Sequence, residues 1–250
     1  MIDLHSHLLP GVDDGSRSVE QSVAVLREMA RHGITDICLT PHLLASMAER
    51  GMPAPYDAAF DTLIRQAPAS PRLHPGAEVM LDQPLDPVVG RDRRVTLGGT
   101  GYILVEFPRM VPAPAVIGGL ESVCAAGLVP VLAHPERYVC CTVDRVREWK
   151  ALGALMQVDA STLLADRKRG TRARDLVAEG LADILAADNH GDGRLISTTC
   201  QVMAQRGGEL QADLLGRLNP ERILRNEPII PVPPFPMRGS WWDRLRASLG

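Results

Sequence analysis

Residues 1–42 read MIDLHSHLLPGVDDGSRSVEQSVAVLREMARHGITDICLTPH, and this stretch decides the fold. Its apolar residues predict a short strand at residues 2–4 and a second strand at residues 34–40. Between them, apolar side chains recur at helical spacing over residues 19–30, directly after Ser18, a typical N-cap residue. A strand, a helix and a second strand in this order predict a parallel β-α-β unit.

The same alternation continues along the rest of the chain. Further strands are expected at residues 77–80, 102–107, 129–133, 155–158 and 184–187, and further helices at 57–66, 115–126, 144–152, 171–179 and 196–206. About seven strands in β-α units favour a closed or distorted barrel over an open doubly wound sheet. No Gly-x-Gly-x-x-Gly turn follows the first strand, which argues against a dinucleotide site.

The composition is that of a globular protein and excludes several function classes. The chain has 250 residues, of which 45% are hydrophobic and 23% are charged. A net charge of −3 and an aromatic content of 4% argue against a nucleic-acid partner. Neither a signal peptide nor an apolar run of about 20 residues is recognisable. The five cysteines lack zinc-type spacing and are odd in number, so we expect no disulfide framework and a cytoplasmic location.

The chain is expected to form one catalytic domain over residues 1–227 and a distinct tail over residues 228–250. The tail is rich in proline, and Trp241 and Trp242 follow the prolines. We expect the tail to pack over the barrel or against a second subunit, so a homo-oligomer is possible. Contact with a membrane interface is the alternative, because tryptophan and arginine suit that boundary.

Five of the seven histidines stand beside the ends of predicted strands. Carboxylates occupy equivalent places, and in a parallel barrel the carboxyl ends of all strands face one rim. Imidazole and carboxylate ligands suit zinc, manganese or iron. Nine residues are too many for one ion and about right for three, if one carboxylate bridges. The predicted ligands are His5, His7, Asp14, His42, Glu78, Glu106, His134, Asp188 and His190.

The charge of such a site suggests its substrate. Three divalent ions and four carboxylates would leave about two positive charges, which match a phosphate monoester dianion. Arg137 follows His134 by three residues, and its guanidinium is suited to hold phosphate oxygens in a bidentate fork. The alternative reading of Arg137 is a surface ion pair with Glu136.

Taken together, the motifs resemble those of a known superfamily. Met-Ile-Asp-Leu-His-Ser-His, Val-Asp-Asp-Gly, Thr-Pro-His, Gly-Ala-Glu, Val-Glu-Phe, Ala-His-Pro-Glu-Arg-Tyr and Ala-Asp-Asn-His resemble the polymerase-and-histidinol-phosphatase (PHP) superfamily. Within it, the chain looks most like the bacterial metal-dependent protein tyrosine phosphatases of the CpsB/CapC type. The resemblance covers residues 1–227 and implies an α/β fold, a distorted TIM-like (β/α)₇ barrel of the PHP type.

The resemblance also implies the cofactor, the site and the partner. Three divalent ions are expected, with manganese first and iron or zinc as alternatives. By resemblance, the first ion is held by His5, His7, Glu78 and Asp188, the second by Glu78, Glu106 and His134, and the third by Asp14, His42 and His190. Arg137 would contact phosphate. The substrate would be phosphotyrosine on the tail of a bacterial tyrosine kinase that controls capsule or exopolysaccharide synthesis and export.

The expected mechanism is direct hydrolysis. A metal-bridging hydroxide would attack phosphorus without forming a phosphoenzyme. The leaving phenolate has a conjugate-acid pKa of about 10 and needs less protonation than an alkoxide. Asp14 or a metal-bound water would help as the acid.

Two other readings stay open at this point, and a third is set aside. The protein could be a PHP phosphatase or phosphodiesterase for a small molecule such as histidinol phosphate. It could be a non-catalytic, metal-stabilised module that regulates polysaccharide export. Cys141 with Arg147, and Cys200 with Arg206, have the spacing of cysteine phosphatases, but no glycine lies between them to form a phosphate cradle, so we read both as coincidence.

Overall fold

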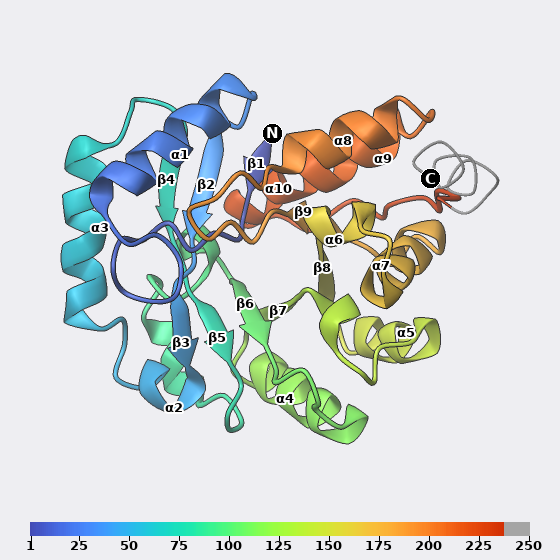
Figure 1. The fold of residues 1–250 in the computed structure, drawn as a ribbon. Coiled ribbons are helices and arrows are strands. Elements are labelled where there is room, and N and C mark those ends of the chain that lie inside the picture. The colour runs from blue at the N-terminus through green and yellow to red at the C-terminus, as the bar shows by residue number, and fades with distance from the viewer. Residues whose placement is uncertain (238–250) are drawn as a thin grey trace.

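The computed structural model describes residues 1–237 and shows a ring of parallel strands (Figure 1). Strand pairing forms two sheets, ordered β1-β2-β4 and β3-β5-β6-β7-β8-β9. Every pairing within them is parallel, as the alternation of strands and helices predicts. The strands are β1 (Ile2–Asp3), β2 (Asp36–Leu39), β3 (His42–Leu44), β4 (Arg72–Pro75), β5 (Glu78–Met80), β6 (Tyr102–Glu106), β7 (Val129–Ala133), β8 (Leu155–Asp159) and β9 (Ile184–Ala186).

The two sheets are parts of one barrel wall. β2 continues into β3 after a break at Pro41, and β4 continues into β5 after a break at Gly76, so the nine described strands occupy seven positions. A parallel bridge between Ser6 and Asn189 joins the ends of β1 and β9 and closes the ring. The predicted distorted seven-position barrel is therefore confirmed.

The breaks in the wall have local causes. Pro41 has no N–H and cannot continue the hydrogen-bonded ladder. Gly76 lies against Thr40, where an added Cβ would be 3.2 Å from the Thr40 Cγ2 atom. The sequence predicted residues 34–40 as one strand and missed β3 and β4, because a three- or four-residue strand leaves little periodicity.

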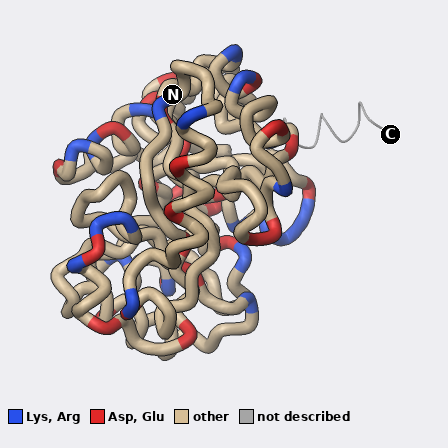
Figure 2. The backbone as a smooth tube through the Cα atoms, turned by 90° about the vertical axis from the view of Figure 1, so that its left-hand side faces the viewer, with Lys and Arg blue, Asp and Glu red and all other residues tan. Residues whose placement is uncertain are grey.

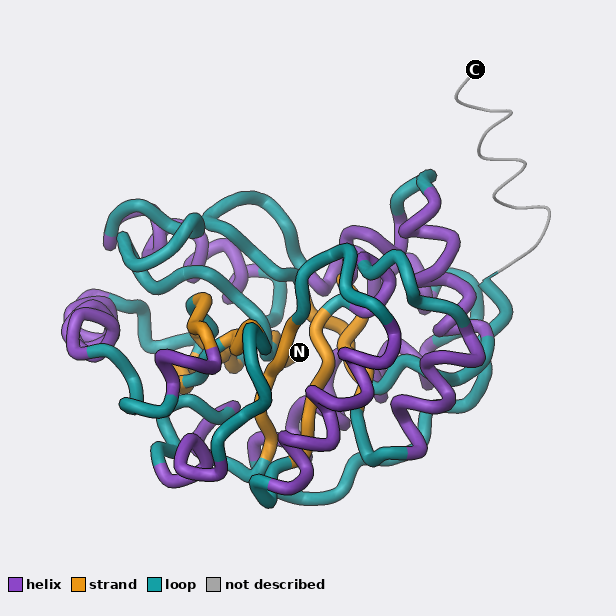
Figure 3. The backbone as a smooth tube through the Cα atoms, turned by 90° about the horizontal axis from the view of Figure 1, so that it is seen from below, coloured by secondary structure: helices purple, strands orange, loops and turns teal. Residues whose placement is uncertain are grey.

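Helices surround the strands, as the view from below shows (Figure 3). The six predicted helices are all present, with ends that differ by a few residues. The helical turns between residues 209 and 224 were not predicted, because each is short and Pro220 interrupts the pattern. The helices are α1 (Val19–Arg31), α2 (Ala45–Ala48), α3 (Ala54–Gln66), α4 (Ala113–Ala125), α5 (Val143–Ala151), α6 (Ala160–Leu164), α7 (Lys168–Ala178), α8 (Ile196–Ala204), α9 (Glu209–Asp213) and α10 (Asn219–Leu224).

Helix α1 shows how the sequence builds the wall. The Ser18 hydroxyl accepts a hydrogen bond from the Gln21 N–H at 3.3 Å, which caps the helix as predicted. Val23, Leu26 and Met29 form its buried face. This amphipathic pattern fixes α1 against the barrel.

The first part of the proline-rich segment packs on the barrel. Val232, Phe235 and Met237 are buried, and the Phe235 N–H donates to the Val177 carbonyl of α7 at 3.2 Å. The predicted apolar face with Trp241 and Trp242 lies outside the described residues. Within residues 1–237, no helix has both the length and the apolar character that a membrane span requires. Basic and acidic residues are interspersed on the face shown in Figure 2.

Candidate metal centre

The structure brings all nine predicted ligands together at one rim of the barrel. Most of them end or follow a strand or lie in a loop on the same side, because parallel strands expose all their carboxyl ends there. His42 and Glu78 are instead the first residues of β3 and β5, directly after the two breaks in the wall. Their ligand atoms form four overlapping groups, each within 4.8 Å: His7–Asp14–His42–His190, His5–Glu78–His134, His5–His7–Asp188 and His42–Glu78–Glu106. The pattern of histidines and carboxylates beside predicted strand ends therefore predicted correctly which side chains lie close together.

His5 and His7 face each other across the buried side of the centre. Their Nε2 atoms are 3.1 Å apart. Each Nε2 also lies 3.2 Å from Glu78 Oε2 and within 3.3 Å of Asp188 Oδ1. Two imidazole nitrogens and two carboxylate oxygens thus converge on one small volume, as a ligand set for a cation does.

The other ring nitrogens of these two histidines are held by side chains that the sequence analysis did not select. His5 Nδ1 lies 2.9 Å from Gln157 Oε1, and His7 Nδ1 lies 2.8 Å from Asp13 Oδ2. Such partners fix the tautomer and orientation of metal-binding histidines. Asp13 also accepts from the Gly15 and His42 N–H groups. The acidic pair in Val-Asp-Asp-Gly was a signal for Asp13, whereas nothing local marked Gln157.

Glu78 lies at the middle of the cluster. Its Oε1 is 2.8 Å from His134 Nε2, and its Oε2 is 3.0 Å from His42 Nδ1. Although Oε2 is buried, it has no hydrogen-bond partner with acceptable geometry. A buried carboxylate oxygen that is surrounded by imidazole nitrogens but not hydrogen-bonded fits a bridging metal ligand. The donor set therefore fits divalent cations.

His42 lies between the other two parts of the centre. Its Nδ1 is 3.1 Å from Glu106 Oε1, while its Nε2 is 3.3 Å from Asp14 Oδ1. His190 Nε2 lies 3.5 Å from the same Asp14 oxygen. The resemblance groups His42 with Asp14 and His190 alone, whereas the structure also places it against Glu78 and Glu106.

Two ligand positions have unusual backbone conformations. His134 has φ of 34° and Asp188 has φ of 49°, both in the left-handed region that residues other than glycine rarely adopt. Each such residue costs about 1–3 kcal/mol and persists where surrounding structure requires it. Here the conformation turns a side chain toward the rim directly after β7 or near the end of β9.

Burial and opposite charges shift the pKa values of the cluster strongly. Burial alone would raise the pKa of Glu78, but the neighbouring His5, His134 and His42 rings hold it well below its ordinary value. Burial likewise disfavours a charged His42, yet Glu106 and Glu78 raise its pKa to about 10. Cations and protons compete for these atoms, so metal affinity should fall in acid.

Arg137 lies beside the ligands, in the 3₁₀ turn η3 (Pro135–Arg137) after β7. Its Nη2 is 2.6 Å from Asp159 Oδ2 and also contacts Asp188. Glu136 is buried and accepts from the Asp159 N–H at 3.0 Å, so the surface pair between Glu136 and Arg137 is wrong. Arg194, which the sequence analysis did not select, reaches within 3.9 Å of Asp188 Oδ2 and adds a second cation.

The cysteines do not form a nucleophilic site. Cys141 is buried, and burial raises the pKa of its thiol to about 12. Arg147 is paired with Asp144 and Glu179 on the surface instead. Burial also raises the pKa of Cys200 to about 11. The structure therefore agrees that the Cys-x₅-Arg spacing is a coincidence.

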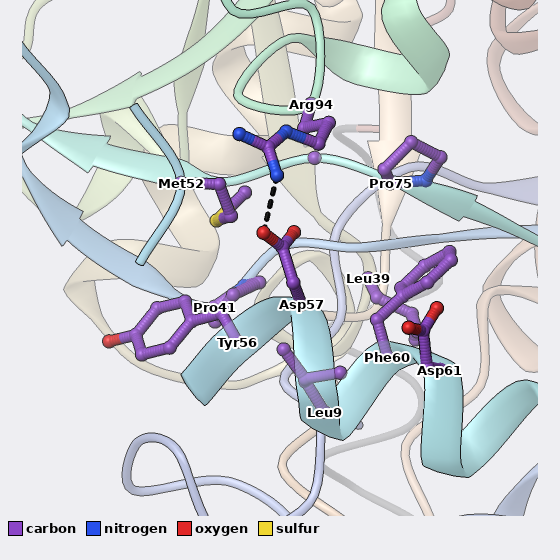
Figure 4. Close-up of a pocket in the computed structure, with 11 residues that line it drawn as sticks. Leu9, Leu39, Pro41, Met52, Tyr56, Asp57, Phe60, Asp61, Pro75 and Arg94 are labelled. Carbon is purple, nitrogen blue, oxygen red and sulfur yellow. Dashed lines mark hydrogen bonds and ion pairs between the residues drawn. The ribbon is translucent and has the colours of Figure 1, made fainter. Parts of the chain in front are cut away.

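A cavity of about 460 Å³ lies behind the rim, next to α3. Figure 4 shows Tyr56, Asp57 and Phe60 of α3 on one side of it, with Asp57 directed at Arg94. None of the nine predicted ligands lines this cavity. It therefore adds no ligand to the metal centre.

Comparison with known proteins shows which family the chain belongs to. A family model described as "Capsular polysaccharide synthesis, CpsB/CapC" matches residues 1–225. The chain belongs to this family. The resemblance inferred from the motifs is thereby confirmed.

Relatives in this family are named as phosphatases. The tyrosine-protein phosphatase YwqE of Bacillus subtilis (strain 168) is 30% identical, over 95% of this chain and 97% of that protein. The tyrosine-protein phosphatase CpsB of Streptococcus agalactiae serotype V is 29% identical, over 90% of this chain and 99% of that protein.

Solved structures agree with the fold. A structure from a study of YwqE of Bacillus subtilis and CpsB of Streptococcus pneumoniae, described as unique metal-dependent tyrosine phosphatases, superposes with a TM-score of 0.75. It is 27% identical, and the match covers 96% of this chain and 100% of that chain. The phosphotriesterase of Mycobacterium tuberculosis, at 14% identity and a TM-score of 0.54 over 83% and 85% of the two chains, shares the barrel fold alone.

Proposed function

We propose that this protein is a metal-dependent protein tyrosine phosphatase, a phosphoric monoester hydrolase. The observation that carries the proposal is the cluster of five imidazoles and four carboxylates at one rim, with Arg137 beside it. Membership of the CpsB/CapC family supports it, because relatives over most of the chain are named tyrosine-protein phosphatases.

The centre would hold three divalent ions, with manganese as the expected metal. His5, His7 and Asp188 would hold one of them, and Glu78 would be the bridging carboxylate. Glu106 and His134 would complete the second group with Glu78, and Asp14, His42 and His190 would hold the third ion. Bound divalent ions would supply an activated water at neutral pH and neutralise charge on the phosphate oxygens.

The protein's own residues would orient the phosphate. Arg137 is partly buried, with its guanidinium against Asp159 and Asp188, so its direction is fixed before substrate binds. A guanidinium held in this way binds phosphate oxygens with little loss of freedom. Arg194 lies near the same carboxylate and would add positive charge.

Asp14 would help as the acid when the tyrosine leaves, with a metal-bound water as the alternative. Its side chain is 71% exposed, in contrast to the buried Glu78, and it faces the outer ring nitrogens of His42 and His190. A tyrosine leaving group has a pKa of about 10, so modest assistance suffices.

The partner would be a bacterial tyrosine kinase whose phosphorylated tail is the substrate, in the control of capsule or exopolysaccharide synthesis. The family description supports the link to capsule synthesis, and the names of the relatives as tyrosine-protein phosphatases support a phosphotyrosine protein as the partner. A cytoplasmic location and a homo-oligomer stay predictions.

The test is phosphate release from a phosphotyrosine-tail peptide by the purified protein, with manganese and with EDTA. Release that needs manganese and stops with chelator is the expected result. Histidinol phosphate is assayed in parallel. Faster turnover of histidinol phosphate would favour a small-molecule phosphatase, and no release from either compound by metal-loaded protein would favour a regulatory module.

A further inference from the structure

Beside the metal centre lies an apolar cleft of about 380 Å³ that the proposed chemistry does not use. Its lining combines two candidate metal ligands, His42 and Glu106, with apolar side chains from β3, β5, α2 and α3. The full lining is His42, Leu43, Leu44, Met47, Tyr56, Met80 and Glu106. The cleft is therefore continuous with the metal centre.

The cleft is built by neighbouring positions of the barrel wall. β3, β5 and β6 pair side by side, so Leu44, Met80 and Glu106 end adjacent strands. Helix α2 follows β3 directly and contributes Met47. Tyr56 closes the side toward the cavity of Figure 4, and its hydroxyl donates to the His42 carbonyl at 3.1 Å, so it presents its ring.

The apolar side chains are open to solvent. Leu44 is 42% exposed and Met47 is 48% exposed, so both side chains are available to contact an apolar ligand. Methionine is unbranched and adapts to the shape of an apolar partner. The volume lies at the lower end of the range of about 300–1,000 Å³ that is typical of ligand pockets.

The charges around the cleft disfavour an acidic peptide. Neither lysine nor arginine lines it. Asp82 holds the start of α2 by accepting from the Ser46 N–H at 3.1 Å and from the Ser46 hydroxyl at 2.6 Å, so the nearby fixed charge is negative. A substrate segment that enters here should be apolar rather than acidic.

We propose that this cleft is a specificity subsite, which receives the apolar side chain next to the phosphotyrosine of a peptide substrate. The phosphate would lie at the metal centre, the tyrosine ring beside His42 and Glu106, and the neighbouring side chain against Leu44 and Met47. The inference rests on the proposed phosphatase activity and adds the sequence that the enzyme selects.

The experiment compares three phosphotyrosine peptides that differ only in the flanking residue, which is leucine, serine or glutamate. We expect kcat/KM to fall about tenfold from the leucine to the glutamate peptide, since burial of one aliphatic side chain is worth about that factor or more. Dissociation constants of fluorescent analogues with a non-hydrolysable phosphonate should follow the same order.

Met47→Lys tests the cleft directly, and Ile64→Lys is its control. Both side chains stand on exposed helical positions, at 48% and 47% exposure, but Ile64 does not line the cleft. Met47→Lys should reverse the preference toward the glutamate peptide, and Ile64→Lys should retain the leucine preference.

Equal kcat/KM and equal affinity for all three peptides would overturn the subsite while leaving the phosphatase proposal intact. Identical behaviour of Met47→Lys and Ile64→Lys would also overturn it. If manganese-loaded protein hydrolyses none of the peptides and does not hydrolyse p-nitrophenyl phosphate, the proposed function fails, and the subsite fails with it.

Discussion

Two clusters of histidine and carboxylate stand at opposite ends of the barrel, each around a buried carboxylate, and they differ in charge balance. At the amino ends of β2 and β4, Asp36 Oδ1 accepts from Arg72 Nε and faces His74 Nε2, both at 2.9 Å. Asp36 and Arg72 are directly opposite across the parallel pair. One carboxylate thus meets a permanent cation, and the group is complete without any ligand.

The cluster at the carboxyl ends of the strands is not complete in this way. His5 Nε2 and His7 Nε2 face each other at 3.1 Å, and Glu78 Oε2 is buried without a hydrogen bond. Asp188 contacts Arg137, but Glu78, Glu106 and Asp14 are shared among imidazoles and have no permanent cation as a partner in the described residues. The difference teaches that histidine and carboxylate at a strand end indicate a metal site only when the donor atoms converge without satisfying one another.

The strongest test removes the central carboxylate at each end. Glu78→Ala should reduce metal content below one ion per chain and lower turnover by at least about 100-fold, because a bridging ligand is lost. Asp36→Ala, the control at the opposite end, should keep the metal content. Elemental analysis measures the metal content of both variants, and phosphate release measures their turnover. Full metal content and full activity in Glu78→Ala would contradict the assignment of a metal centre at this end of the barrel.

A substitution of Arg137 tests whether substrate binding at the rim can be lost while metal binding is kept. Arg137→Ala should keep the metals and lower kcat/KM by about 10²–10³, because a preorganised charge against the phosphate is lost. Arg137→Lys should recover only part of the loss, since lysine has no bidentate fork. Unchanged kinetics of Arg137→Ala on a phosphotyrosine peptide would exclude its role.

Gln157 tests whether the partner of His5 matters to the centre. Gln157→Leu removes the oxygen that lies 2.9 Å from His5 Nδ1. We expect manganese affinity to fall about tenfold, the lower end of the range for such partners of metal-binding histidines. Metal titration followed by calorimetry measures this effect, and an unchanged dissociation constant would show that packing alone orients the ring.

The Asp36 cluster predicts a pH dependence of stability. Burial opposes the charge on Asp36, but Arg72 and His74 lower its pKa. A lowered pKa contributes stability that is present above the unfolded value of about 3.9 and is lost as the pH falls through the folded value. Asp36→Asn should lower Tm by about 2–4 °C at neutral pH, and the difference from wild type should shrink below about pH 4. A constant difference from pH 7 to pH 3 would contradict this assignment.

Cys141 should have the smallest effect on turnover. Cys141→Ser places a hydroxyl at a buried position and should cost about 1–3 kcal/mol of stability, while kcat/KM stays unchanged. Circular dichroism and phosphate release check the two parts. A folded but inactive Cys141→Ser protein would show that the reaction depends on Cys141 and not on the metal centre at the rim.

Much of the fold and the candidate site could be predicted because both depend on local pattern. Alternating strands and helices require a parallel arrangement, and parallel strands place every residue that follows a strand on one rim. His134 and Glu106 were found from this rule alone. The strands β3 and β4 and the short turns near Pro220 were missed, because a few residues carry too little periodicity.

The sequence by itself determined the parallel barrel and the set of nine ligand candidates, while it left Arg137 open between a phosphate contact and a surface ion pair. Only the tertiary structure decided which atoms meet. It set His42 between Glu106 and Asp14, brought Gln157 to His5 from 152 residues away, and joined Leu44 and Met80 in one cleft. The physical reason is that local pattern fixes where a side chain leaves its strand, whereas ring closure and helix packing fix which side chains converge.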